Sequence, residues 1–383
     1  MNRHFLRDIA DIQTGPFGSQ LHKEDYVDIG TPIVTVEHLG NRVFTEQNLP
    51  KVSDEDKARL SKYVLKEGDI VFSRVGSVDR CSYVDAAHDG WMFSGRCLRV
   101  RPNTEVDPLY LYYFFCLEDT KQFVRNIAVG ATMPSINTKL LGEVEVAYPS
   151  QTEQQKIVAL LSALDDKIEI NQKINDNLYA QAKAIFAQRF IGIETIPDGW
   201  KKGNLLDIAN YLNGLAMQKF RPRDDEVGLP VLKIKELRQG SCDVSSELCS
   251  PSIKPEYIVH DGDVIFSWSG SLLVDIWCGG TCGLNQHLFK VTSETYDQWF
   301  YYLWTAHHLE RFIAIAADKA TTMGHIKRGE LEKAEVLIPS EKDYKEISSL
   351  MNPLFNLIIA NRIEARKLAE PVSYTHLTLP TNR

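Results

Sequence analysis

The stretch that decides the fold is QTEQQKIVALLSALDDKIEINQKINDNLYAQAKAIFAQRF, Gln151–Phe190. It contains neither Pro nor Gly, and its apolar residues recur at steps of three and four, which predicts one face of a long α-helix. About 40 residues would span roughly 60 Å at 1.5 Å per residue, which is longer than a typical globular helix. A helix of this length needs a helical partner, so we expect a strut with a different domain on either side.

Polar residues interrupt the apolar seam of this helix. Asn171 and Asn175 occupy seam positions, where an Asn lowers stability but fixes the register and the partner of a coiled coil. We expect this helix to contribute the following seam residues: Leu161, Leu164, Ile168, Asn171, Asn175 and Leu178.

The sequences on the two sides of the helix form an internal repeat. YVLKEGDIVFSRVGS (Tyr63–Ser77) returns as YIVHDGDVIFSWSGS (Tyr257–Ser271), and GTPIVTVEHL (Gly30–Leu39) returns as GLPVLKIKEL (Gly228–Leu237). The offset between matched blocks drifts along the chain, as expected for duplicated domains whose loops differ in length. The repeat predicts two homologous domains, at residues 1–150 and 196–340, with the central helix at 151–195 between them.

A second long helix is expected at residues 341–370, directly after the second copy. Its seam residues Leu354, Ile358 and Asn361 correspond to Leu164, Ile168 and Asn171 of the first helix, so the required partner lies in the same chain. Pro353 is expected to kink this helix or, with Asn352 as N-cap, to restart it.

The tail PVSYTHLTLPTNR, residues 371–383, matches nothing in the first copy and breaks the helical pattern. Its VSYTHL segment is what one reading frame of a common sequencing adapter encodes. We therefore expect a foreign tail that truncates the second helix.

Each half shows a mixed pattern of strands and helices. β-branched runs such as PIVTV and GDIVFS, bounded by Gly and Pro, predict strands. PLYLYYFFCLEDTKQFVRNI and its counterpart YDQWFYYLWTAHHLERFIAIA predict aromatic-rich helices, whose rings are expected in the core rather than on a base-stacking surface.

The composition narrows the class of protein. The chain has 383 residues and a net charge of −8, and neither half is rich in Lys and Arg, so it does not have the character of a protein that coats DNA by itself. No apolar run is long enough to span a membrane and the N-terminus is no signal peptide, which predicts a cytoplasmic protein. The seven scattered Cys are expected to be reduced and mostly buried, and no spacing predicts a metal site.

Together, GDIVFSRVGS, GATMPSIN and YPSQTEQQKIVALLSALDDKIEINQKIN resemble the specificity (S) subunits of type I restriction–modification systems. The resemblance covers about residues 1–370. The resemblance is weaker in the second copy. There MGHIK stands in place of MPSIN, and SEKDYKEI stands in place of the segment with which the first long helix begins.

The resemblance implies an α+β fold with two mixed target-recognition domains, separated by long conserved helices that pack as an antiparallel coiled coil with pseudo-two-fold symmetry. Each domain would read half of a bipartite site in double-stranded DNA. The helices would dock two methyltransferase (M) subunits and restriction (R) subunits would join them. The chain would itself be noncatalytic, with S-adenosylmethionine, ATP and Mg²⁺ on the partner subunits.

Catalytic alternatives find little support in the sequence. Asn352-Pro353-Leu354-Phe355 is similar to the Asn-Pro-Pro-Phe/Tyr element of adenine methyltransferases, but its third residue is Leu and no glycine-rich cofactor loop accompanies it. Asp165-Asp166-Lys167 has a nuclease-like spacing on what is expected to be a solvated helix face. We expect no catalytic residue in this chain.

Base reading requires Arg or Lys for guanine and Asn or Gln for adenine, presented on loops. In the first domain the candidates are Ser19, Gln20, Lys23, Arg74, Arg80, Arg96, Thr132, Ser135 and Asn137. In the second domain they are Gln218, Lys219, Arg221, Lys235, Trp268, Asn285, Gln286 and His287. For each of them a solvated or capping role is at least as common.

A second function remains open, namely a noncatalytic coiled-coil scaffold that binds proteins and does not recognise DNA. The acidic charge mildly favours the scaffold, and the resemblance favours DNA specificity.

Overall fold

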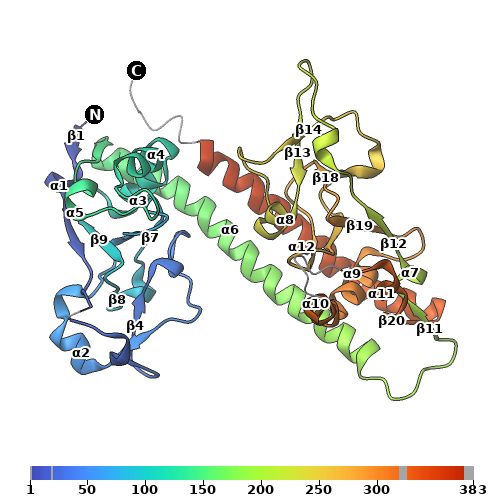
Figure 1. Ribbon diagram of the computed structural model, residues 1–383. Coiled ribbons are helices and arrows are strands. Elements are labelled where there is room, and N and C mark those ends of the chain that lie inside the picture. The colour runs from blue at the N-terminus through green and yellow to red at the C-terminus, as the bar shows by residue number, and fades with distance from the viewer. Residues whose placement is uncertain (1, 19, 319–325, 375–383) are drawn as a thin grey trace. The chain divides into compact units, whose positions relative to one another are not determined.

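Figure 1 shows the computed structural model, which describes residues 2–18, 20–318 and 326–374. The chain forms two compact units, one reaching to Leu164 and the other comprising Asp165–Glu370. The division falls within helix α6 (Gln151–Phe186), which continues as the π-helical turn η5 (Ala187–Ile191). The long helix predicted from Gln151 is therefore confirmed.

The first unit contains two four-stranded sheets and a two-stranded ribbon. One sheet is antiparallel in the order β2 (Ala10–Thr14), β9 (Cys97–Pro102), β6 (Ile70–Ser73), β7 (Cys81–Tyr83). The other has the order β3 (Tyr26–Val27), β5 (Lys51–Val52), β4 (Thr31–Val34), β8 (Met92–Phe93), and β1 (Asn2–Phe5) pairs with β10 (Glu145–Tyr148). Its helices are α1 (Leu6–Ile9), α2 (Asp54–Arg59), α3 (Pro108–Cys116), α4 (Glu118–Ile127) and α5 (Thr138–Leu141), and its 3-10 turns are η1 (Lys23–Asp25), η2 (Val36–His38), η3 (Ser61–Tyr63) and η4 (Ala86–His88).

The second unit repeats most of this arrangement. Its first sheet has the order β12 (Asn210–Asn213), β19 (Leu288–Thr292), β16 (Val264–Ser267), β17 (Leu273–Ile276). The other has the order β14 (Leu248–Cys249), β13 (Leu229–Leu232), β18 (Cys282–Leu284), β15 (Ile258–Val259), and β11 (Lys201–Asn204) pairs with β20 (Glu335–Ile338). Its helices are α7 (Leu205–Ile208), α8 (Ile234–Gln239), α9 (Gln298–His307), α10 (Leu309–Asp318), α11 (Arg328–Glu332) and α12 (Glu341–Tyr374), and its 3-10 turns are η6 (Met217–Lys219) and η7 (Pro255–Tyr257).

The two copies match down to single backbone hydrogen bonds. At the best-matched sequence block, the Gly68 N–H donates to Val84 O over 2.9 Å, and the Gly262 N–H donates to Trp277 O over 2.7 Å. The strand orders β2-β9-β6-β7 and β12-β19-β16-β17 are also the same. The predicted duplication and the mixed α/β character of each copy are confirmed.

Each copy also joins its long helix in the same way. The Asp107 N–H, at the start of α3, donates to Gln154 Oε1 in the first turn of α6 over 2.8 Å. The Asp297 N–H, at the start of α9, donates to Tyr344 Oη in the first turn of α12 over 2.5 Å. The aromatic-rich helix and the long helix are thus bonded at equivalent positions in both copies.

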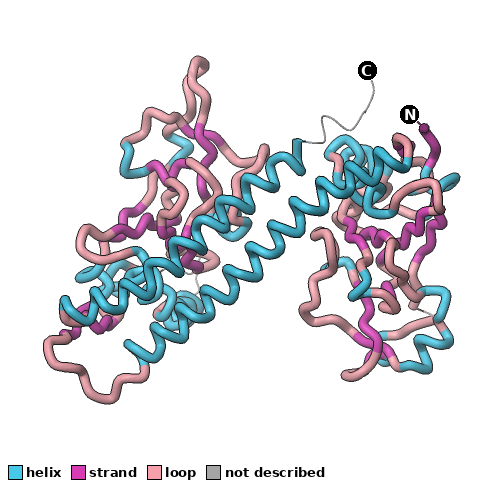
Figure 2. The backbone as a smooth tube through the Cα atoms, turned by 180° about the vertical axis from the view of Figure 1, so that it is seen from behind, coloured by secondary structure: helices cyan, strands magenta, loops and turns pink. Residues whose placement is uncertain are grey.

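The helices α6 and α12 pack as an antiparallel pair within the second unit (Figures 1 and 2). Asn171 Nδ2 donates to Glu364 Oε2 over 2.7 Å, and Asn175 Nδ2 donates to Ile358 O over 3.2 Å. Asn361 Nδ2 donates to Asn175 Oδ1 over 2.9 Å. Because residue numbers rise in one helix as they fall in the other, the pair is antiparallel, which confirms the predicted arrangement.

The predicted restart of the helix at Pro353, with Asn352 as N-cap, is wrong, because α12 runs without a break from Glu341 to Tyr374. The ring of Pro353 lies on the exposed side of the helix, and Met351 and Phe355 on either side of it are buried in the core. A proline removes one backbone hydrogen bond, and the buried apolar face that continues past it holds the helix together.

The helix also does not stop at the start of the tail. Residues 371–374 are still part of α12, so the helix does not break at Pro371 as predicted. Residues 375–383 lie outside the described part of the chain.

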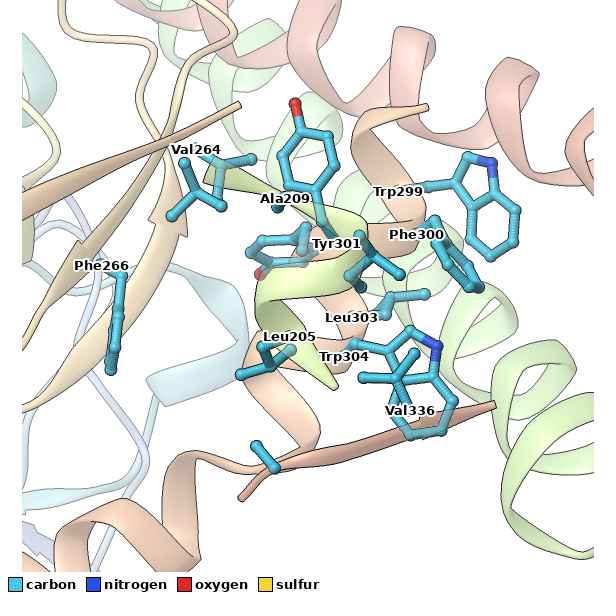
Figure 3. Packing of buried hydrophobic residues seen from close by; sticks show 14 of the residues in the cluster. Leu205, Ala209, Val264, Phe266, Trp299, Phe300, Tyr301, Leu303, Trp304 and Val336 are labelled. Atoms are coloured by element: carbon cyan, nitrogen blue, oxygen red, sulfur yellow. The ribbon is translucent and has the colours of Figure 1, made fainter. Parts of the chain in front are cut away.

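Aromatic side chains fill the core of the second unit (Figure 3). Trp299, Phe300 and Trp304 of α9 are all buried, and the ring centroid of Phe186 in α6 lies 5.1 Å from that of Trp304. The predicted core role of these aromatics is confirmed. The buried Cys residues are Cys81, Cys97, Cys249, Cys278 and Cys282.

Candidate nucleic-acid interface

A polar cleft of about 450 Å³ lies in the second domain and gathers six of its eight candidate residues. The lining residues are Gln218, Arg221, Lys233, Ile234, Lys235, Glu247, Asn285, Gln286 and His287. Lys233 and Glu247 were missed in the sequence, although Lys233 and Lys235 flank Ile234 in the matched block GLPVLKIKEL. The structure thus brings together residues from four separate segments of the chain.

A close backbone approach positions the loop that carries Gln218 and Arg221. The Leu215 N–H donates to Leu284 O over 2.9 Å, and Met217 is buried beneath the loop. A Cβ added to Gly214 would lie 2.2 Å from Asn285 O, and one added to Gly15 would lie 2.2 Å from Ser94 O. Only glycine fits at this crossing in either domain.

The turn that carries Asn285, Gln286 and His287 is closed by its own side chain. Asn285 is 7% exposed, and its Oδ1 accepts the His287 N–H over 3.2 Å. His287 Nδ1 lies 3.0 Å from Ser269 Oγ. The turn therefore presents these side chains from a fixed backbone.

Three cations and one carboxylate line this cleft. Lys233 Nζ lies 2.7 Å and Arg221 Nη1 lies 3.6 Å from the Glu247 carboxylate. The hydrogen bond from Lys233 lowers the pKa of Glu247 below its usual value, so this carboxylate stays ionised at neutral pH. The cleft is a local excess of positive charge on a chain whose net charge is −8.

The two other candidates of the second domain do not line the cleft. Lys219 lies exposed in η6. Trp268 Nε1 donates to Asn213 Oδ1 over 2.9 Å, and the ring of Trp268 packs 5.8 Å from that of Phe289 at the edge of the core. These contacts fit a packing role for Trp268.

The first domain has a larger cleft, of about 820 Å³. It is lined by Pro16, Phe17, Gly18, Leu21, Tyr26, Thr35, Val36, Glu37, Asn48, Pro50, Ser94, Gly95 and Arg96. Of the candidates in this domain, Arg96 is in the wall. Arg74 is adjacent, since its Nη1 donates to Gly95 O over 3.0 Å and its guanidinium lies 5.3 Å from the centre of the Phe17 ring.

Other candidates of the first domain already have structural contacts. Gln20 Oε1 accepts the Tyr63 hydroxyl over 2.7 Å, and Arg80 donates to Leu39 O. Lys23 lies in η1, and Ser19 lies outside the described residues.

The predicted loop Thr132–Asn137 lies beside the GDIVFSRVGS block. Ile136 N–H donates to Arg74 O over 2.9 Å, and Ser135 Oγ donates to Val129 O over 3.3 Å. Asn137 Oδ1 accepts the Leu140 N–H over 2.9 Å as the N-cap of α5, whereas Thr132 is exposed. Capping therefore occupies the acceptor of Asn137 but not its amide donors.

The two clefts occupy equivalent places in the duplicated fold. Ser94 N–H donates to Val34 O over 2.9 Å, and Asn285 N–H donates to Leu232 O over 3.2 Å, so the same turn meets the same strand in both domains. The equivalent wall positions are Thr35 and Lys233, Val36 and Ile234, Glu37 and Lys235, Pro50 and Glu247, Ser94 and Asn285, Gly95 and Gln286, and Arg96 and His287.

The predicted helix-seam residues fall into two groups. Asn171, Asn175 and Asn361 are joined across the helix pair as described above. The half-buried or buried apolar members of the set that belong to the second unit are Ile168, Leu178, Leu354 and Ile358. Leu164 is half-buried at the end of the first unit, and Leu161 is buried in the core of the first domain.

Comparison with known proteins assigns the family. The profile described as "Type I restriction modification DNA specificity domain" matches residues 2–180 and again residues 197–369. The chain therefore belongs to this family and carries its domain twice.

Its relatives and structural neighbours have consistent names. The MjaIX specificity subunit of a type I restriction enzyme from Methanocaldococcus jannaschii is 26% identical over 93% of this chain and 87% of the relative. The putative MjaX specificity subunit from the same organism is 24% identical over 95% and 88%. The crystal structure of the S subunit of a type I system from M. genitalium gives a TM-score of 0.58 at 14% identity, over 100% and 96% of the two chains, and supports the fold.

Two further observations concern the described part of the chain. No group of three or more His, Cys, Asp or Glu there could hold a metal ion. No helix there has both the length and the hydrophobicity that crossing a membrane requires.

Proposed function

We propose that this chain is the noncatalytic DNA-specificity subunit of a type I restriction–modification complex, and that its two domains each read one half of a bipartite site in double-stranded DNA. The observation that carries the proposal is the pair of equivalent clefts, with different wall residues, on a duplicated fold. A duplicated reader with different wall residues can recognise two different half-sites, which a homodimer of identical domains cannot.

The cleft of the second domain has the side chains that reading a base edge requires. Lys and Arg donate to guanine O6 and N7, and Asn and Gln pair with adenine N6 and N7. Arg221, Lys235, Gln218 and Gln286 supply both kinds of chemistry within one cleft. Its cations would also attract the phosphate backbone locally, which the net charge of the chain does not.

The helix pair offers a surface for partner subunits. Ile170 and Ile174 on α6, and Leu350 and Leu357 on α12, are exposed apolar residues at spacings that place each pair on one side of its helix. Exposed apolar residues on one side of a helix are available for contact with a partner protein. We infer that two methyltransferase subunits dock on the helices and that restriction subunits join the complex in the cytoplasm.

The cofactors of the reaction are assigned to those partners. S-adenosylmethionine would bind the methyltransferase subunits, and ATP and Mg²⁺ would serve the restriction subunits. In this proposal the present chain contributes sequence recognition and the spacing between half-sites.

The alternative, a protein scaffold without DNA recognition, accounts for the helix pair but not for the clefts. A scaffold has no need of three cations and three amides in the wall of one cleft.

The test is methylome sequencing of a host that carries this gene together with its neighbouring methyltransferase gene. We expect N6-methyladenine at a bipartite motif that is absent when either gene is omitted, and no methylation by the purified chain alone. A motif that persists without this chain would contradict the proposal, and an unchanged methylome would favour the scaffold.

A further inference from the structure

At one wall position the two equivalent clefts carry side chains of opposite charge. Glu37 of the first domain and Lys235 of the second occupy the same place, one residue before the buried anchor of a short helical turn. The side chains have opposite charge on an otherwise matched backbone.

In the first domain a buried histidine fixes this turn. His38 is 1% exposed, and its Nδ1 accepts the Thr35 N–H over 3.0 Å. Its Nε2 lies 3.1 Å from Gln47 O. The contacts of His38 with Thr35 and Gln47 therefore fix the backbone from which the Glu37 side chain projects.

In the second domain a buried glutamate takes the place of the histidine. Glu236 is 4% exposed, and its Oε2 accepts the Lys233 N–H over 3.2 Å. Its Oε1 accepts the Ser246 hydroxyl over 3.2 Å. Two chemically different anchors thus preserve one backbone geometry, which indicates that the turn must hold the preceding surface residue, Glu37 or Lys235, in place.

The surface side chains themselves are accessible and oriented. Lys235 Nζ lies 3.0 Å from Ser245 Oγ and 3.4 Å from Asp243, while its side chain remains 59% exposed. Glu37 Oε1 accepts the Thr35 hydroxyl over 3.1 Å and is also exposed. An ammonium has three donors and a carboxylate several acceptor sites, so both groups keep capacity for a further partner.

We propose that Glu37 and Lys235 are equivalent base-discriminating residues: Lys235 donates to O6 or N7 of a guanine in one half-site, and Glu37 accepts from the N4 amine of a cytosine in the other. This proposal rests on the proposed DNA-specificity function and assigns its chemistry to two positions. Major-groove guanine presents only acceptors where cytosine presents a donor, so the opposite charges select opposite bases.

The experiment uses the full chain assembled with its methyltransferase subunit. Selectivity is measured as methylation rate on duplexes that carry each base pair in turn at every position of the two half-sites. We expect Lys235→Met to lose roughly 5- to 150-fold of the preference for one guanine in one half-site only. Glu37→Gln should relax one cytosine position in the other half-site, and Lys235→Arg should retain the guanine.

Matched controls change the same charges away from the clefts. Lys254→Met in the second domain and Glu55→Gln in the first both alter exposed residues outside the cleft walls. Both controls should keep all base preferences of the parent, and thermal unfolding should show that all variants fold.

The outcomes separate the two proposals. A parent complex that methylates no bipartite motif would contradict the proposed function itself. A parent with a clear motif, together with Lys235→Met and Glu37→Gln variants that keep every base preference, would overturn the present inference alone. A uniform loss of rate on all duplexes would also overturn it, because that pattern is typical of a phosphate contact.

Discussion

The two domains share a backbone framework, but they differ in the residues that line their clefts and in the residues that face their long helices. The order of the first sheet, the glycine crossings and the bond from an Asp to the long helix are the same. Their cleft walls are not, since the second domain has Lys233 and Lys235 where the first has Thr35 and Glu37. Duplication has kept what fixes the backbone and changed what faces a ligand.

The second difference is the attachment to the long helix. In the second unit Arg366 of α12 forms a bidentate ion pair with Asp261. Its Nη1 lies 2.9 Å from Oδ1, and its Nη2 lies 2.8 Å from Oδ2. Arg362 also donates to Asp275 over 2.8 Å. Two guanidinium groups therefore fasten the second domain to its helix.

The first copy has no such residues at the equivalent positions. Gln172 and Asp176 stand in α6 where α12 has Arg362 and Arg366, and Ser82 and Glu67 stand where the second domain has Asp275 and Asp261. No pair of opposite charges remains. The Arg366–Asp261 and Arg362–Asp275 pairs thus have no counterpart at the equivalent positions of the first copy, whereas both copies have a cleft.

The largest expected effect comes from exchanging a whole domain. Replacing residues 196–340 with the corresponding domain of another specificity subunit should change one half-site completely and leave the other unchanged, because each cleft is built within its own domain. Methylome sequencing of the chimera beside the parent gives the measurement. The reciprocal exchange of residues 1–150 is the control, and a change at both half-sites in either chimera would show that the domains do not read independently.

A smaller effect is expected from removing the ionic attachment. Arg366→Ala should lower the free energy of unfolding of the second unit by about 1–3 kcal/mol, since it removes two charged hydrogen bonds and leaves the partly buried Asp261 with fewer partners. The matched control is Gln172→Ala, because Gln172 is exposed and should change stability by less than about 0.5 kcal/mol. Denaturant unfolding followed by Trp fluorescence measures both. Equal effects for the two variants would mean that the pair does not contribute to stability.

Much of the fold could be predicted because its signals are periodic or repeated. The 36-residue helix α6 has no breaker and a continuous apolar face, and matched blocks such as GDIVFS and GDVIFS identify the same strand twice. The error at Pro353 has a tertiary cause, because the buried residues on either side of the proline sustain a helix that local preference would interrupt.

The candidate sites were less predictable, because residue type does not reveal which loops meet. The second cleft was assembled largely from expected residues, since Arg, Lys, Asn and Gln there stand out by chemistry. Glu37 and Lys233 were missed although GTPIVTVEHL and GLPVLKIKEL align them with Lys235 and Thr35, because the sequence does not show that these positions line a cleft. The Arg366–Asp261 pair joins residues 105 positions apart, and no local pattern predicts it.

The pseudo-two-fold relation between α6 and α12 fails at one buried position. Asn361 is equivalent to Asn171, and Asn361 bonds to Asn175 across the pair. The residue of α12 that is equivalent to Asn175 is Ala365. The hydrogen bond between Asn361 and Asn175 therefore has no counterpart between Asn171 and residue 365. Asn171 is 1% exposed, and its Oδ1 has no hydrogen-bond partner.

The smallest effect is expected from a substitution that restores this symmetry. Ala365→Asn should supply a donor for Asn171 Oδ1, which is worth about 0.5–1.5 kcal/mol. The lower helix propensity of Asn costs roughly 0.6 kcal/mol, so the net gain should lie between about 0 and 1 kcal/mol. Room is available, because Ala365 and Asn171 line the same cleft of about 490 Å³. The control is Ala360→Asn, because Ala360 lies on the exposed side of α12. This variant should have the same loss of helix propensity without the added hydrogen bond. Thermal unfolding of the two variants therefore isolates the hydrogen bond, and an Ala365→Asn variant no more stable than Ala360→Asn would mean that Asn171 gains nothing from a symmetric partner.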